Sequence, residues 1–206
     1  MDQRADPGET AVVQAILDDT IALYTRMRGL DPAPVVSAAA AIRGAFAAGG
    51  KLLVFGNGGS AADAQHLATE LVGRFTRERL ALPAIALTTD TSILTAVAND
   101  YGFERVFVRQ IEALGRPGDV AFGISTSGKS PSVLKALDAA RARGLTTVAL
   151  TGYDGGPIGA AAQIHINVPA ASTPRVQEVH GTLIHAICEL VERTLEAGSG
   201  KLEAGS

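Results

Sequence analysis

The chain has 206 residues, 47% of them hydrophobic and 19% charged, and a formal net charge of −3. This composition allows one sizeable core, so we expect a single domain over residues 10–195, and the lack of a basic run argues against nucleic acid as the main ligand. Apolar stretches broken by charge or glycine predict no membrane segment, and the single cysteine, Cys188, fits a reducing, cytoplasmic compartment.

The N-terminal part of the chain is helical in pattern. From Thr10 to Met27 apolar residues recur at spacings of three and four, which predicts an amphipathic helix ahead of any strand. Pro32 and Pro34 follow the end of that helix. A second helical stretch then runs to about Ala48 and ends at a pair of glycines.

Short apolar runs then alternate with helical stretches. We expect strands at 52–55, 84–87, 120–124, 147–150 and 165–168, and helices around 60–75, 91–98, 103–114 and 130–143. Continuous apolar strands joined through helices predict an α/β fold with a parallel sheet buried on both faces. A last amphipathic helix is predicted from Arg175 to Leu195, and the small, polar repeat over 197–206 predicts a flexible tail.

Two loops at predicted strand ends have the composition of ligand sites. Ligands of open parallel sheets bind at the carboxyl ends of the strands, near the free N–H groups of helix starts. The first loop, residues 56–60, has glycines that let the backbone approach a ligand closely, and it offers Ser60 as a helix cap. The second offers four hydroxyls, which favour a phosphate group over a plain polar turn. The candidate binding residues are Asn57, Gly58, Gly59 and Ser60 in the first loop, and Ser125, Thr126, Ser127 and Ser130 in the second.

The second loop also matches a nucleotide-binding pattern. The run GISTSGKS at 123–130 fits the Walker A motif and lies between a predicted strand and a predicted helix. A nucleotide hydrolase is therefore an alternative. Such enzymes need a second acidic residue at the end of another buried strand to hold magnesium. Asp90 lies a few residues past one strand, but no predicted strand ends in an aspartate.

Histidine and glutamate side chains form the second group of candidates. His66 and Glu70 are four residues apart and share one helical face, where they could bind a metal or form a plain surface ion pair. His185 lies among apolar neighbours in sequence, which is costly for an imidazole unless it is paired or functional. A satisfied core histidine remains the alternative for His185. For His180 the alternatives are a group that supports the site from behind its ligands and a plain surface residue, and we expect the surface residue.

Five sequence blocks together resemble a known family. They are GNGGSAADAQHLATE, LTAVANDYG, GISTSGKS, LTGYDGG and RVQEVHGTLIH, and they span about residues 10–195. In this order they are similar to sugar isomerase (SIS) domains, and within these to phosphoheptose isomerases. The resemblance implies a three-layer sandwich with a five-stranded parallel sheet flanked by helices and an added N-terminal helix. It also implies a homotetramer with shared active sites.

The resemblance further implies a zinc-assisted isomerisation of a phosphorylated seven-carbon sugar, D-sedoheptulose 7-phosphate, to D-glycero-D-manno-heptose 7-phosphate. The family's zinc ligands correspond to His66, Glu70, Gln177 and His185 of this chain. Its phosphate loop corresponds to the second loop described above. Substrate contacts correspond to Asn57, Ser60, Asp100 and Gln177, with Glu70 also touching the sugar.

One departure from the family and one related branch bear on this interpretation. Lys129 stands where phosphoheptose isomerases usually have asparagine, and we expect it to add a cation near the phosphate. A non-catalytic SIS branch that binds the bacterial replication initiator is the alternative to an isomerase. Because that branch lacks the equivalents of Glu70 and His185, a chain with both residues is predicted to be an enzyme.

The implied mechanism moves a proton between two carbons through an enediol. We assign Glu70 as the base and His185 as the acid, with a metal or nearby donors holding the oxyanion. A glutamate bound to zinc is a weaker base, so either the metal is held loosely or Glu70 shifts during turnover. Gln177 and His185 lie about 12 Å apart on a continuous helix. Either that helix begins after Gln177, or the two residues reach one site from different subunits.

Overall fold

The computed structural model describes residues 6–196. It divides the chain into two compact units, the first ending at Asp31 and the second beginning at Pro32. The first unit holds α1 (Pro7–Arg28), in agreement with the predicted amphipathic helix, and the Asp6 carboxylate caps it by accepting from the Gly8 N–H at 2.9 Å. The predicted tail at 197–206 lies outside the described residues, and the single domain over 10–195 stays a prediction.

The second unit alternates strands and helices, and all five predicted strands are present. Its elements are α2 (Ala33–Ala47), β1 (Leu52–Gly56), α3 (Gly59–Val72), β2 (Ala84–Ala86), α4 (Thr91–Tyr101), η1 (Phe103–Arg105), α5 (Val106–Leu114), β3 (Val120–Ser125), α6 (Pro131–Ala142), β4 (Thr146–Gly152), α7 (Gly156–Ala161), β5 (Ile164–Val168) and α8 (Thr173–Glu196). The sequence did not predict α7. Gly155 and Gly156, both with positive φ, have the composition of a turn and hide the start of this short helix.

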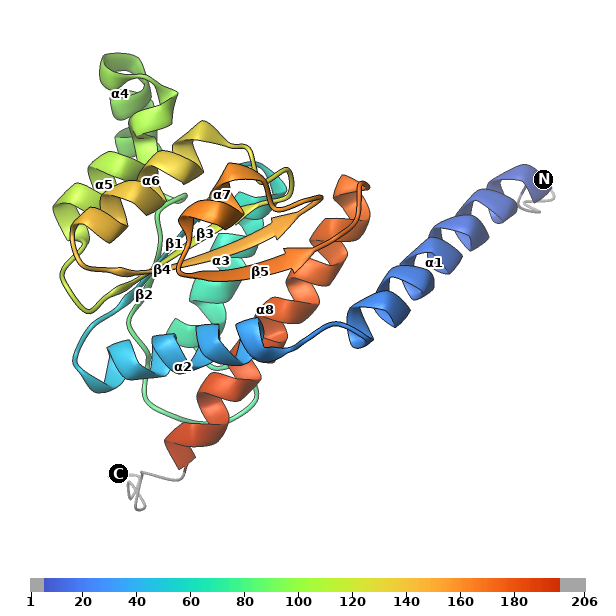
Figure 1. The fold of residues 1–206 in the computed structure, drawn as a ribbon, viewed down its shortest axis with the longest axis horizontal. Coiled ribbons are helices and arrows are strands. Elements are labelled where there is room, and N and C mark those ends of the chain that lie inside the picture. Colours follow the sequence, from blue (N-terminus) through green and yellow to red (C-terminus); the bar gives the residue numbers. More distant parts are fainter. Residues whose placement is uncertain (1–5, 197–206) are drawn as a thin grey trace, which may run out of the picture. The chain divides into compact units, whose positions relative to one another are not determined.

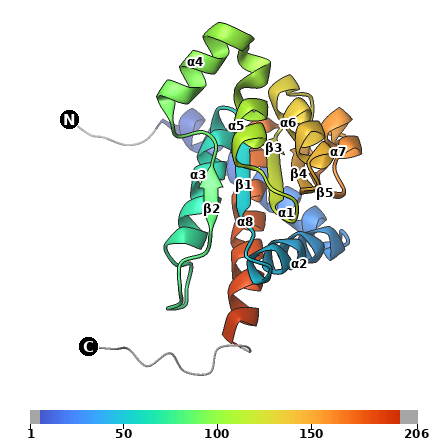
Figure 2. The same ribbon diagram turned by 90° about the vertical axis from the view of Figure 1, so that its left-hand side faces the viewer.

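The five strands form one parallel sheet in the order β2-β1-β3-β4-β5. Helices cover both faces, so this unit has three layers (Figures 1 and 2). The two faces carry separate apolar cores, because side chains alternate along each strand. Leu52 and Val54 of β1 pack with α2, α3 and α8, whereas Leu53 and Phe55 pack with α5, α6 and α7. The α/β prediction is confirmed. No described helix is long and apolar enough to cross a membrane.

His180 contradicts the expectation of a surface residue, because its side chain is completely buried. Its Nε2 donates to the Thr151 carbonyl of β4 at 3.0 Å, and its Nδ1 has no partner among the described residues. Burial lowers the pKa of the imidazole to about 4, and the hydrogen bond to Thr151 offsets this only in part. The residue therefore joins α8 to the sheet as a neutral group.

Replacing His180 by glutamine is expected to flatten the acid limb of the stability profile. In the unfolded chain this imidazole takes up a proton near pH 6.5, but in the fold only near pH 4, so stability falls as pH drops between these values. The difference amounts to about 3 kcal/mol for the group. Urea unfolding of both proteins at about pH 7 and about pH 4.5 measures it. Equal losses of stability in both proteins would contradict the assignment.

Candidate functional site

The two predicted loops meet at the carboxyl edge of the sheet. The first follows β1 and the second follows β3, its neighbour. Asn57 joins them, because its Nδ2 donates to Ser130 Oγ at 2.7 Å and to Ser132 Oγ at 3.0 Å. Between them lies a cavity of about 220 Å³, lined by Asn57, Ser60, Ile124, Ser125, Thr126, Ser127, Lys129 and Ser130. A larger hollow of about 500 Å³ shares Ser127 and Lys129 with it.

The sequence predicts Ser60 as the cap of the helix after the first loop, and this prediction is wrong. The N-cap of α3 is Gly58, with φ of 57°, and no side chain caps this end. The helix thus begins two residues early and leaves Ser60 inside its first turn, 3% exposed and lining the cavity. Ser130 is the N-cap of α6, but its hydroxyl accepts from Asn57 instead of capping the helix.

Gln177 lies against the first loop. A β-carbon added to Gly59 would come within 2.1 Å of its Nε2, so the glycine allows the Gln177 side chain to approach this closely. The side chain of Gln177 is thereby placed beside the start of α3. No spacing in the sequence indicates this contact, since the two residues are more than a hundred positions apart.

Gly59→Ala is expected to lower activity without unfolding the protein. The new methyl group must displace the end of the Gln177 side chain, which is flexible, while alanine itself favours a helix. Gly181→Ala on α8 is the matched control, because its added methyl would meet nothing within 4 Å. Thermal unfolding and steady-state kinetics of both variants measure the effect. Equal kinetic constants for the two variants would show that the position of the Gln177 side chain beside Gly59 does not affect activity.

His66, Glu70 and His185 come together on the facing helices α3 and α8. One ligand atom from each lies within 4.8 Å of the other two. The two Nε2 atoms are 2.7 Å apart, and His66 Nε2 is 3.6 Å from a Glu70 oxygen. Two imidazoles and one carboxylate are a usual ligand set for zinc. The cluster is compact enough for one ion to replace the contact between the imidazoles.

The apolar neighbours of His185 in sequence do not bury it. Ile184, Ile187 and Cys188 face the core, while the His185 side chain lies on the exposed side of α8. Its ring contacts those of His66 and Phe75, with centroids 5.0 and 5.3 Å away. The core-histidine alternative is therefore wrong. Because α8 is continuous from Thr173 to Glu196, the alternative of a helix starting after Gln177 is wrong as well.

The chain is similar in sequence to proteins of one known family. A sequence profile of the SIS domain matches residues 16–152. The phosphoheptose isomerase of Trichlorobacter lovleyi is 55% identical over 188 residues, which cover 90% of this chain and 96% of that protein. The chain belongs to the SIS-domain family, in its phosphoheptose isomerase branch.

Solved structures agree with this placement of the SIS domain. Phosphoheptose isomerase GmhA from Neisseria gonorrhoeae is 45% identical, with a TM-score of 0.85, over 89% of this chain and 98% of that one. A phosphoheptose isomerase from Francisella tularensis is 34% identical, with a TM-score of 0.87, over 90% and 98% of the two chains. The predicted family and fold are thus confirmed.

Two aspartates of this SIS domain lie outside the cavity and the cluster. Asp90, which the nucleotide-hydrolase alternative needed, caps α4 by accepting from the Ile93 N–H at 2.9 Å. Its role is therefore structural, and the alternative loses its magnesium ligand. Asp100 is exposed near the end of α4 and accepts from Asn99 Nδ2 at 2.7 Å. It does not line the cavity of its own chain.

Three residues near the SIS-domain site carry no signal in the sequence. Ser132 shares the Asn57 amide, and Phe75 stacks beside His185. Asp63 lies one turn before His66, and its Oδ2 is buried with no partner among the described residues. Burial raises the pKa of Asp63 to about 6, against an opposing effect of His66. Serine and aspartate are common near helix starts, so the sequence alone does not mark Ser132 and Asp63 as residues near a site. Only their contacts in the structure do so.

Proposed function

We propose that this SIS-domain enzyme interconverts D-sedoheptulose 7-phosphate and D-glycero-D-manno-heptose 7-phosphate. The observation that carries the proposal is the pairing of two sites in one chain. A hydroxyl-lined cavity suits a phosphate, and the cluster of His66, Glu70 and His185 suits proton transfer. The name shared by relatives that are 55% identical over nine-tenths of the chain supports the same reaction.

Phosphate binding is assigned to the loop after β3. Ser125, Thr126, Ser127 and Ser130 offer hydroxyls around the cavity, and the N-terminus of α6 adds a favourable dipole for an anion. Lys129 also lines the cavity and supplies the cation there. Asn57 and Ser60 of the first loop also line this cavity, whereas Gly58 and Gly59 do not, and their contact with the substrate stays a prediction. The phosphate thus anchors the sugar at a distance from the reacting carbons, and binding energy is used for orientation.

Proton transfer is assigned to the facing pair on α3 and α8. Glu70 removes a proton from C1 of the ketose, which gives an enediolate; the O1 hydroxyl proton passes to O2, and His185 returns a proton to C2. General acid–base transfer of this kind needs both groups on the same substrate. Their ligand atoms lie within 4.8 Å of each other, close enough for one substrate carbon pair.

A zinc ion is the proposed cofactor, held by His66, Glu70 and His185 with Gln177 as a fourth ligand. When bound there, zinc supplies a Lewis acid that stabilises the oxyanion of the enediol. Three of these residues form the cluster described above. Gln177 lies on α8, about two turns before His185, and α8 is continuous between them. We therefore assign the fourth ligand to Gln177 of a neighbouring subunit.

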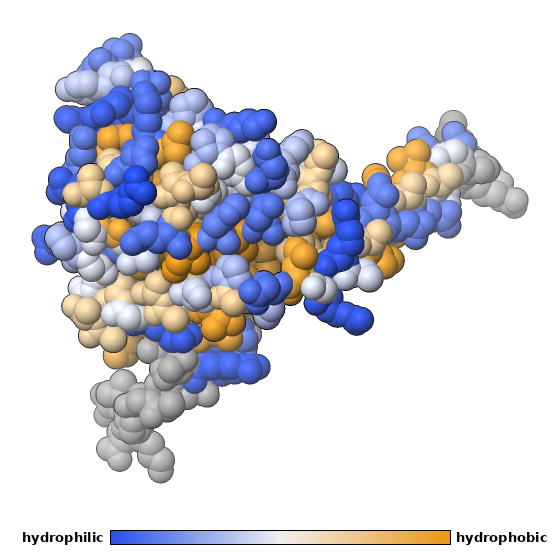
Figure 3. All heavy atoms as spheres, viewed as in Figure 1, coloured by the Kyte–Doolittle hydropathy of each residue, from blue (hydrophilic) through white to orange (hydrophobic). Residues whose placement is uncertain are grey.

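A homotetramer with shared sites is proposed on the basis of exposed apolar surface. Val12, Val13, Leu17 and Ile21 of α1 are each more than half exposed, and Figure 3 shows apolar side chains at the surface of this helix. Helix α4 buries none of its residues within the chain. Contact with further copies of the chain would cover such surfaces. It would also bring Asp100 of α4 to a neighbour's substrate. The one cysteine, which is buried, supports a cytoplasmic location.

Incubation with D-sedoheptulose 7-phosphate, followed by NMR, tests the reaction. We expect an aldose product and exchange of one sugar proton with deuterated solvent, both lost after chelation and restored by zinc. Unphosphorylated sedoheptulose is the control and should react far more slowly. No product from a zinc-loaded tetramer would contradict the proposal. Binding to the replication initiator would then be the function to test.

A further inference from the structure

A buried ion pair connects α8 with the loop that follows α3, and these two helices carry His66, Glu70 and His185. Arg79 Nε is 3.0 Å from Glu192 Oε1, and their side chains are 9% and 0% exposed. Taking two charges out of water is unfavourable unless further hydrogen bonds satisfy them. Neither residue has a part in the phosphate cavity or in proton transfer. The pair therefore needs another explanation.

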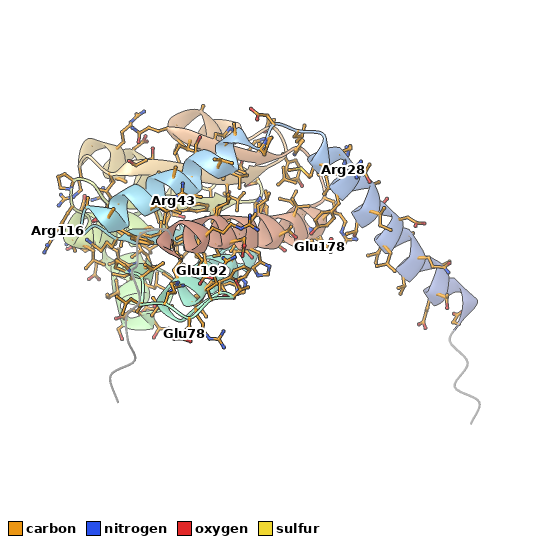
Figure 4. All side chains as sticks on the ribbon, turned by 90° about the horizontal axis from the view of Figure 1, so that it is seen from below. Arg28, Arg43, Glu78, Arg116, Glu178 and Glu192 are labelled. Atoms are coloured by element: carbon orange, nitrogen blue, oxygen red, sulfur yellow. The ribbon has the colours of Figure 1, made fainter. Side chains whose placement is uncertain are left out.

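Glu192 holds the loop that follows α3. Its carboxylate accepts from the backbone N–H groups of Phe75, Thr76 and Arg77, at 2.9, 3.0 and 3.0 Å. Burial raises the pKa of this carboxyl, but the three backbone donors and Arg79 outweigh burial and lower it below its usual value. Glu192 is thus an ionised anchor on α8, on the side facing this loop (Figure 4).

Arg79 holds the end of α3 itself. Its guanidinium donates to the Glu70 carbonyl at 2.7 Å, to the Leu71 carbonyl at 2.8 Å and to the Gly73 carbonyl at 3.1 Å. Carbonyls in the last turn of a helix have no partner within the helix, and a cation there is favourable for the helix dipole. The Glu70 backbone is therefore bound directly by Arg79.

Both anchored elements carry residues of the proposed site. His66 and Glu70 lie on α3, whose last turn Arg79 binds. His185 lies on α8, seven residues or about two turns before Glu192, and so on the same side of that helix. The anchored loop also places the Phe75 ring 5.3 Å from the His185 ring. One ion pair thus connects the two helices that supply the cluster.

We propose that Arg79 and Glu192 are positioning residues that fix the distance between the His66–Glu70 half of the site and His185. The effect on turnover rests on the proposed function, whereas the effect on the two imidazoles does not. Loss of the pair leaves α3 and α8 packed through their apolar residues, but it frees the last turn of α3 and the Phe75 loop. A shift of about 1 Å in such a site can reduce turnover about a hundredfold.

The four histidines of the chain allow a direct test. With selective ¹⁵N-histidine labelling of the metal-free protein, Glu192→Gln should shift the ring resonances of His66 and His185. His165 and His180, which bond to Thr151 elsewhere, should not move. In the zinc-loaded enzyme, kcat should fall about 10- to 100-fold with KM nearly unchanged, and zinc affinity should fall about 10- to 100-fold.

Lys51→Met is the matched control. It breaks another ion pair, that of the partly exposed Lys51 with the buried Asp119 at 2.6 Å, which lies just before β1 and β3 and includes no residue of α3, α8 or the loop after α3. It should destabilise the protein without shifting His66 or His185. Arg79→Lys provides a second variant if Glu192→Gln does not fold.

Unchanged His66 and His185 resonances, or equal shifts of all four histidines, would overturn the proposal. The same shifts in Lys51→Met would do so too. A selective shift in a protein without isomerase activity would leave the positioning role standing and refute the proposed function alone.

Discussion

Glu70→Gln is expected to lower kcat by about 100- to 10,000-fold, because glutamine cannot accept the C1 proton. The substitution preserves the size of the side chain. It also preserves the backbone carbonyl that Arg79 binds, so the fold should survive. Conversion of D-sedoheptulose 7-phosphate followed by NMR gives kcat and KM. KM should change much less than kcat, because the loop after β3, which we propose as the phosphate site, does not include Glu70.

Glu78→Gln is the control for loss of a carboxylate. Its side chain is 92% exposed on the loop after α3, and its pairing with Arg74 is a surface contact. This variant should have wild-type kinetics. A zinc titration of Glu70→Gln separates the two roles of the residue. If zinc is fully bound while turnover is lost, Glu70 acts as the base. Wild-type turnover by the variant would remove it from the mechanism.

Mixing two inactive variants should restore activity if Gln177 reaches a neighbour's site. Glu70→Ala and Gln177→Ala subunits, unfolded together and reassembled in equal amounts, should recover about a quarter of the wild-type activity. Half of the sites would have an intact Glu70, and half of their neighbours an intact Gln177. Activity after reassembly, against each variant reassembled alone, measures the recovery.

The control mixture combines Glu70→Ala with His185→Ala. These two residues lie within one cluster of the same chain, so every site would lack one of them and no activity should return. Recovery in the control mixture, or none in the first mixture, would refute the assignment of Gln177 to a second subunit. In that case Gln177 would act within its own chain, beside Gly59.

The strands and the layers of the fold could be predicted from local patterns in the sequence. Leu52 to Phe55 are apolar without interruption because helices cover both faces of β1. This run therefore predicts both the strand and a layer of helices on each side of it. Helix ends are less well predicted. Helix α3 was expected to run to about residue 75, but it ends at Val72 because Gly73 breaks it and Arg79 binds the free carbonyls.

The site was predictable as far as it depends on spacing along one element. His66 and Glu70 share a face of α3 for this reason. Their meeting with His185 came from family resemblance, because packing of α3 on α8 joins positions more than a hundred residues apart. Burial of His180 was missed for the same reason, since its neighbours Val179 and Gly181 do not show that this position of α8 faces the sheet.

The strand order places the cavity where it is. The chain leaves β1 toward β2 on one side and returns to β3 on the other, so the loops after β1 and β3 lead into helices on opposite faces of the sheet (Figure 2). Such a topological switch point opens a crevice whatever side chains line it. The position of the cavity is therefore set by the connectivity of the chain, and substitutions in the loops after β1 and β3 change only the side chains that line it.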